Sequence, residues 1–233
     1  MDANDNRIPG EVDVKTGNPF KSHQNMHSST LRHKMGNPAP MGLFGYAVTS
    51  LVVSLYNARA GVSATTPQNL ASGMCLFSAG FIQILAGIFE LIAGNTFGAT
   101  AFCSYGAFWL SLGLNLLPSS GIAQAYTSVS EYERLQASAI FSLAWAIFTF
   151  LIFIASHRTN GGVVAMFFFM FLAYLLNAIA DFTQTGGARV AGGIVGILSS
   201  ASAFWSAMAE LLASERTSIV QLPLFSLKAN EEV

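Results

Sequence analysis

Six long apolar runs restrict what this chain can fold into more than any other feature. They lie at residues 41–58, 70–93, 97–117, 135–156, 163–181 and 189–213. Each run has about 18 residues or more, enough for a helix to cross the hydrocarbon core of a bilayer. None shows the alternation of every second residue that marks a membrane β-strand. The sequence therefore predicts an all-α membrane protein with six transmembrane helices.

The low charge content excludes several classes of protein. Charged residues make up 10% of the chain and hydrophobic residues 52%, whereas a water-soluble domain has roughly 25% charged residues. The formal net charge of −1 argues against a nucleic-acid binder. Cys75 and Cys103 both lie inside apolar runs, which indicates packing rather than a disulfide, and no spacing typical of a metal site occurs. We therefore expect no nucleic-acid partner, no metal and no cofactor.

The distribution of Lys and Arg predicts how the chain sits in the lipid bilayer. If successive helices alternate in direction, eight of the eleven basic residues fall at one end, and Arg59, Arg134 and Arg189 fall at the other. Basic residues favour the cytoplasmic side, so we expect a multi-pass plasma-membrane protein with both termini in the cytoplasm. The polarity divides the chain into a disordered cytoplasmic tail, a six-helix transmembrane domain and a cytoplasmic C-terminal tail, at residues 1–36, 37–215 and 216–233.

Several polar residues fall inside or at the ends of the apolar runs. Glu90 and Glu210 lie near the ends of the second and sixth runs, and Asp181 closes the fifth at the opposite side. An ionisable group among apolar neighbours is costly and often functional, although a group at a helix end also reaches interfacial water. Gln83 and Asn177 lie at membrane depth, where an amide either joins two helices or lines a wet path.

The middle third of every run lacks Lys and Arg. A permanent anion at mid-membrane needs a strong positive partner, and no side chain there supplies one. A small neutral molecule, or a weak acid that travels with a proton, fits such a passage better.

Small residues recur at helical spacing in two of the runs. They are Gly192, Gly196 and Ser200 in the sixth run, and Gly73, Gly80 and Gly87 in the second. Such a face lets helix backbones approach closely, either within one subunit or between subunits. Tyr105, Phe108 and Trp109 likewise share one face of the third run, which by itself indicates packing or an interfacial belt.

Two stretches carry a resemblance to a known family. Two prolines in Asn37-Pro38-Ala39-Pro40-Met41-Gly42-Leu43 prevent a helix from beginning earlier and define the start of the first crossing. This stretch resembles the NPAPLGL signature of the acetate uptake transporters, the YaaH-type family of bacterial succinate–acetate permeases and fungal acetate transporters. Residues 94–109 resemble its GNTFGxTAF and SYGxFW segments, and the resemblance extends over residues 37–215.

The resemblance implies a homo-hexamer in which each subunit has its own six-helix pore for acetate and other short monocarboxylic acids. It also implies an apolar constriction in that pore, formed here by Tyr46, Tyr105 and Met170. Tyr46 stands where the family commonly has phenylalanine, and Met170 where leucine is common. We expect uptake to be linked to protons, or to carry the protonated acid.

Further residues of the expected pathway follow from the same resemblance and from their polarity. Glu90 matches the family's glutamate before GNTFG and is a candidate for proton coupling or gating, and Ala203 matches a small residue that faces the pore. The other polar residues expected to line the pathway are Asn37, Asn95, Gln83 and Asn177.

Three other functions compete with acid transport. A channel for neutral solutes such as ammonia or urea would have a similar sequence, and competition by propionate and formate, but not by ammonium, separates the two. A membrane sensor or adaptor would be unaffected by enlarging Ala203, whereas a pore would lose flux. An enzyme is disfavoured because no Ser/His/Asp, Cys/His or metal arrangement can be assembled, and three of the four histidines lie in the N-terminal tail.

Overall fold

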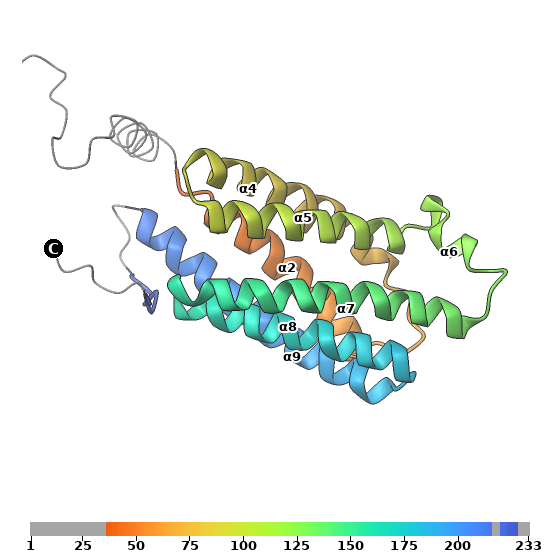
Figure 1. Ribbon diagram of the computed structural model, residues 1–233. Coiled ribbons are helices and arrows are strands. Elements are labelled where there is room, and N and C mark those ends of the chain that lie inside the picture. The colour runs from red at the N-terminus through yellow and green to blue at the C-terminus, as the bar shows by residue number, and fades with distance from the viewer. Residues whose placement is uncertain (1–35, 216–219, 228–233) are drawn as a thin grey trace, which may run out of the picture.

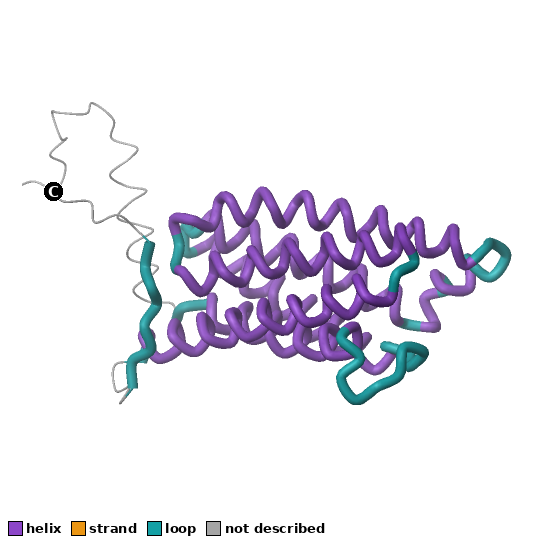
Figure 2. The backbone as a smooth tube through the Cα atoms, turned by 90° about the horizontal axis from the view of Figure 1, so that it is seen from below, coloured by secondary structure: helices purple, strands orange, loops and turns teal. Residues whose placement is uncertain are grey.

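The computed structural model describes residues 36–215 and 220–227. Almost all of the predicted disordered tail at 1–36 lies outside the described residues. Six helices are long and apolar enough to cross a bilayer, at Ala39–Asn57, Asn69–Ile92, Thr96–Leu116, Glu131–Arg158, Gly161–Thr183 and Gly186–Ser214. They run side by side along one axis, with the loops gathered at the two ends (Figures 1 and 2). This confirms the prediction of an all-α membrane protein with six spanning helices.

Four of the spans are built mainly from one α-helix. These are α2 (Ala39–Asn57), α5 (Thr96–Leu116), α8 (Gly161–Thr183) and α9 (Gly186–Ser214). The fourth span is α7 (Glu131–Ala155), continued by the 3₁₀ turn Ser156–Arg158. A short 3₁₀ turn at Pro118–Ser120 and the one-turn helix α6 (Ile122–Ala125) connect α5 to α7.

The second span is not a uniform α-helix. It begins with a 3₁₀ turn at Asn69–Ala71 and α3 (Ser72–Met74), passes through a π-helical segment at Cys75–Phe81, and ends as α4 (Ile82–Ile92). An apolar run specifies a membrane helix but not its hydrogen-bond register, so the sequence did not predict the π-helical segment.

Side-chain caps explain where several helices begin. Asn95, Ser130 and Asn160 each accept a hydrogen bond from a backbone N–H three residues on, at 3.1, 3.2 and 2.9 Å. The cap at Ser130 starts α7 four residues before the apolar run at 135–156, because its first turn is polar. The first span begins at Ala39, with Pro40 in its first turn, rather than just after Pro40 as the sequence suggested.

The helices pack in the order α7, α8, α9, α2, α4, α5. In Figure 1, α4 and α5 lie on one side of α2, and α7, α8 and α9 lie on the other. Aromatic side chains also connect α5 and α7, the last and first helices in this order. Phe108 on α5 stacks on Phe141 of α7 with ring centroids 5.7 Å apart, and Tyr105 meets Phe148 at 5.6 Å.

Small residues bring helices of the same subunit together. Gly196 and Ser200 are buried, and a Cβ added at Gly196 would lie 2.3 Å from Ser54 Oγ on α2. A Cβ added at Gly87 would lie 2.5 Å from Cys103 Sγ on α5. At these positions the small side chains serve packing within one subunit, one of the two alternatives left open by the sequence.

The segment 220–227 returns to the bundle beside the start of α8. The Gly161 N–H donates to the Phe225 carbonyl at 2.9 Å, and the Leu227 N–H donates to the Thr159 carbonyl at 3.1 Å. The Trp205 indole N–H on α9 donates to the Pro223 carbonyl at 3.1 Å. The C-terminal segment therefore lies at the same end of the bundle as the start of α2.

Candidate functional site

A cavity of about 860 Å³ lies at the end of the bundle where α2, α5 and α8 finish and α7 and α9 begin. Under the orientation predicted from Lys and Arg, this is the outer end. The cavity extends inward to four large side chains, here called the floor: Tyr46, Phe108, Trp109 and Met170. Its lining also includes three arginines near the ends of the helices, here called the mouth: Arg59, Arg134 and Arg189.

Tyr46 is 3% exposed and turns its hydroxyl toward α9. The hydroxyl lies 2.7 Å from Ser199 Oγ, and Ser199 in turn donates to the Met166 carbonyl at 2.9 Å. Because the serine hydroxyl has a single hydrogen, Tyr46 is the donor of the first bond. The tyrosine ring faces Trp109, with the ring centroids 6.2 Å apart. Tyr46 thus presents a ring, and not a free hydroxyl, to its neighbours at the floor.

Tyr105 lies deeper, outside the lining of the cavity. It is 2% exposed, and its hydroxyl donates to Thr149 Oγ1 at 2.9 Å. Tyr46, Tyr105 and Met170 belong to one buried apolar cluster that also includes Ala203. The structure therefore brings the three residues of the expected constriction into one core, of which Tyr46 and Met170 line the cavity. Their role as a constriction stays a prediction.

The amides predicted along the pathway have different surroundings. Asn177 lines the cavity and accepts a hydrogen bond from Arg189 at 3.3 Å. Gln83 is 3% exposed and lies outside the cavity lining, and its Oε1 has no hydrogen-bond partner in the described part of the chain. Ala203 is fully buried in the core below the floor and does not line the cavity either.

The predicted residues Glu90, Asn95 and Asn37 lie at the opposite end of the bundle from the mouth. Glu90 is 2% exposed and accepts a hydrogen bond from Asn95 Nδ2 at 2.6 Å, while Asn95 also caps α5. Asn37 donates to Glu210 Oε2 at 3.2 Å, and Asn160 donates to the other oxygen at 3.4 Å. These amides link the ends of neighbouring helices and do not line the cavity.

The mouth has an excess of positive charge. Arg189 forms an ion pair with Asp181, a carboxylate that is 1% exposed and also accepts from Ser138 at 2.8 Å. Arg134 pairs with Glu131 of its own helix, with Nε 2.8 Å from Oε2. Arg59 forms no ion pair with the residues that the structure describes, and its guanidinium lies against Gly186 at the start of α9.

Sequence reasoning used these three arginines only to orient the chain and missed that they share one cavity. The sequence did place all three arginines at the same end of the bundle, and this was the signal that could have indicated a shared cavity. What it lacked was the position of α6 and of the loop after α2, which bring Ile122, Tyr126 and Gln68 to the same lining. Asp181 was considered as a helix-end group reaching interfacial water, but it is buried against Arg189. Among the described residues, no group of three His, Cys, Asp or Glu side chains is placed to hold a metal.

Comparison with known proteins places this geometry in context. Residues 20–229 match the GPR1/FUN34/yaaH family. Ammonia transport outward protein 2 of Saccharomyces cerevisiae is 38% identical over 201 residues, which cover 86% of this chain and 70% of that protein. The succinate-acetate/proton symporter SatP of Escherichia coli is 36% identical over 182 residues, which cover 77% of this chain and 90% of the symporter.

A solved structure has a similar arrangement of helices. The structure of the bacterial acetate channel SatP matches with a TM-score of 0.70 and 30% sequence identity, over 82% of this chain and 99% of that one. The similarity thus extends over the whole bundle that contains the cavity.

Proposed function

The chain belongs to the GPR1/FUN34/yaaH family, and from this premise we propose that it carries acetate and other short monocarboxylic acids across a membrane. The resemblance to the acetate uptake transporters, seen in residues 37–43 and 94–109, is confirmed by the family match. The names of its relatives include a succinate-acetate symporter and an ammonia transport protein, so the family alone leaves two classes of cargo.

The observation that favours an acid is the distribution of charge in the cavity. Three arginines and one carboxylate, Asp181, line it; Arg189 pairs with Asp181 and Arg134 with Glu131 beside the cavity, so the positive charge of Arg59 is in excess. A concave surface with net positive charge raises the local concentration of anions and lowers that of ammonium. The floor beneath it is apolar and aromatic, which suits the short hydrocarbon part of a monocarboxylic acid.

The proposed path crosses the bundle in three stages. The acid collects as an anion at the mouth, descends to the floor, and passes the dry core formed by Tyr46, Tyr105 and Met170. No Lys or Arg lies in that core among the described residues, so the acid crosses with a proton or as the protonated species. Glu90, buried beside Asn95 at the far end, is the candidate for taking up or releasing that proton.

Ammonia is the second candidate cargo, because a relative with 38% identity is named for outward ammonia transport. Ammonia is small and neutral, and a narrow apolar core would pass it as readily as a protonated acid. Transport of acids and transport of ammonia differ in which solutes should compete with acetate for the cavity.

Flux into liposomes that contain the purified chain tests the proposal. Radiolabelled acetate should enter faster in protein-containing than in protein-free vesicles, faster still at acidic pH, and propionate and formate should compete whereas ammonium should not. Acetate flux equal to that of empty vesicles, combined with protein-dependent ammonia flux, would establish the second candidate instead.

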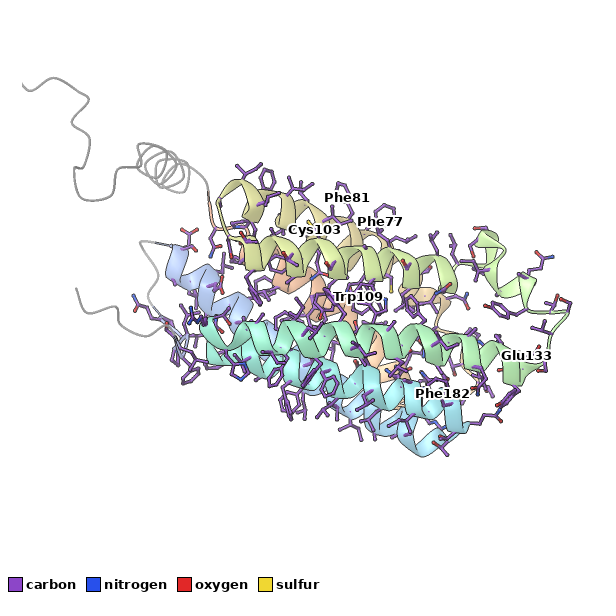
Figure 3. All side chains as sticks on the ribbon, in the orientation of Figure 1. Phe77, Phe81, Cys103, Trp109, Glu133 and Phe182 are labelled. Atoms are coloured by element: carbon purple, nitrogen blue, oxygen red, sulfur yellow. The ribbon has the colours of Figure 1, made fainter. Side chains whose placement is uncertain are left out.

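We infer that the protein works as a homo-hexamer in the plasma membrane with both termini in the cytoplasm, and that it is not an enzyme. Large apolar side chains that face away from the bundle support contacts with lipid or neighbouring subunits, among them Phe77 and Phe81 (Figure 3). Native mass spectrometry should give a complex of six subunits. A C-terminal epitope should become accessible to antibody only after the cells are permeabilised.

A further inference from the structure

One buried hydrogen-bond donor at the floor of the cavity lacks an acceptor. Trp109 on α5 is 3% exposed, and its indole nitrogen has no hydrogen-bond partner in the described part of the chain. Buried N–H groups in folded proteins are nearly always paired, and an unpaired one destabilises the fold. A donor left in this state at the edge of a cavity points to an acceptor that comes from outside the chain.

One polar neighbour of Trp109 is already committed within the chain. The Tyr46 hydroxyl, whose ring lies beside Trp109 in the same floor, is bonded to Ser199. Trp205, by comparison, satisfies its indole N–H with the Pro223 carbonyl. Trp109 lies in the middle of the bundle, away from its outer surface (Figure 3). The unpaired donor is therefore at the inner limit of the cavity and not at a membrane interface.

We propose that the indole N–H of Trp109 donates a hydrogen bond to an oxygen of the transported acid, which makes the floor an outer binding site directly before the constriction. This inference rests on the proposed function and names the group that recognises the carboxyl. An uncharged donor suits the position, because it binds a carboxyl oxygen without placing a fixed positive charge that would hold the anion in the membrane.

The remaining floor residues fit the rest of such a ligand. Phe108 packs edge-on against Trp109, with ring centroids 5.2 Å apart, and Met170 also lines the cavity. Together they offer an apolar surface for a methyl or ethyl group. The indole nitrogen is itself covered in the structure, so binding requires a floor side chain to move. Met170 is the most adaptable of them, because its side chain is unbranched and flexible.

The direct test uses the unaltered protein. The chain contains three tryptophans, at positions 109, 145 and 205, so ¹⁵N-indole labelling gives three N–H signals, assigned through Trp→Phe variants. Titration with acetate in detergent micelles should move the Trp109 indole proton downfield in a saturable manner. The Trp205 signal, whose N–H is already bonded, should stay in place. A Trp109 signal that does not respond to acetate, while liposomes of the same preparation carry acetate, would overturn the inference.

Transport by matched variants gives the second test. Trp109→Phe keeps an aromatic ring but removes the donor, and it should raise the half-saturating acetate concentration roughly three- to tenfold. Trp145→Phe is the control, because Trp145 packs against Phe108 at 5.0 Å but does not line the cavity. Equal half-saturation in Trp109→Phe and Trp145→Phe would contradict the proposed site. If even the wild-type chain moved no short acid, the proposed function itself would fail, which is a distinguishable result.

Discussion

At the residue scale, we expect the hydroxyl of Tyr46 to act as a structural group rather than a transport group, because it is bonded to Ser199. Tyr46→Phe removes the donor to Ser199 but leaves Ser199 bonded to the Met166 carbonyl. We expect a loss of about 0.5–1.5 kcal/mol in stability and nearly unchanged acetate flux, since the ring remains. Thermal unfolding in detergent and liposome flux measure the two effects. A large fall in flux at unchanged stability would instead give the hydroxyl a direct part in conduction.

Glu90 supports a prediction about proton coupling. Glu90→Gln keeps an oxygen that can accept from Asn95 Nδ2, now 2.6 Å from the carboxylate, but removes the site that binds a proton. If Glu90 carries the coupled proton, the variant should let acetate flow down its own gradient but should lose acceleration by an imposed proton gradient.

The matched control for this experiment is Glu210→Gln, at the same end of the bundle. Glu210 accepts hydrogen bonds from Asn37 and Asn160, and this variant should keep the response to the proton gradient. Glu90→Gln vesicles with the full wild-type response would assign the proton to the acid itself.

Single residues differ in how well the sequence predicted their surroundings. Tyr46 and Met170 were placed by the motif resemblance, and the structure puts both in the cavity floor. Trp109 was read only as part of an aromatic face, because an unpaired indole N–H depends on what its neighbours bond to. Asp181 and Arg189 lie eight positions apart across a turn between helices, and nothing in the sequence indicated that they pair.

At the scale of elements, the contact between α2 and α9 depends on glycines of α9, of which Gly193 faces backbone rather than a side chain. A Cβ at Gly193 would lie 2.3 Å from the Ala58 backbone nitrogen, and backbone atoms at a helix end cannot move aside without shifting the helix. Gly193→Ala should therefore destabilise the bundle by roughly 1–3 kcal/mol through overpacking, as a lower unfolding temperature in detergent.

Gly187→Ala, on the same helix, is the control for that prediction. An added Cβ there has no heavy atom within 4 Å, and alanine favours a helix more than glycine does. This variant should be neutral or slightly more stable. Equal unfolding temperatures for the two variants would show that α2 and α9 are not held at the distance seen in the structure.

The number and type of the elements were predictable, while their internal irregularities were not. The length, hydropathy and low charge of a run indicate whether a segment can span a bilayer, and all six spans were found on that basis. The π-helical segment at Cys75–Phe81 lies against α2. There, a Cβ at Gly45 of α2 would lie 2.3 Å from the Ser78 carbonyl oxygen. Such a contact becomes visible only when the two helices are placed together.

At the scale of the whole molecule, the arginines at the mouth should act on substrate capture. Arg59 is exposed, lines the cavity and has no acidic partner among the described residues. Arg59→Gln should raise the half-saturating concentration of external acetate roughly two- to fivefold, and mostly at low ionic strength, because salt screens exposed charges. Ammonia flux should not change.

Arg158→Gln serves as the matched control for the mouth. Arg158 is exposed at the opposite end of the bundle and does not line the cavity. Its substitution by Gln removes the same charge as Arg59→Gln. Half-saturation and its dependence on salt should then equal those of the wild type when acetate is supplied at the mouth. Identical effects of the two variants would mean that net charge matters and the cavity does not.

The whole-molecule arrangement was the part least accessible from the sequence. Positive-inside counting assigned the arginines to an end, but the depth and shape of the cavity depend on five of the six spans, α6 and the loop after α2 packing together. The apolar core below it was expected from the resemblance alone, and a count of hydrophobic residues does not separate a passage from an ordinary core.

The aromatic contacts between α5 and α7 have a consequence for how such proteins evolve. Rings on Tyr105, Phe108, Phe141 and Phe148 meet across this gap. In the proposed pathway, the identity of a few such side chains would set the width of the passage, while the helices that carry them keep their places. A single substitution at one of these positions can change the width of the proposed passage without changing the arrangement of the helices. Homologues that share this helical bundle can thus differ in the solute they transport while keeping the same fold.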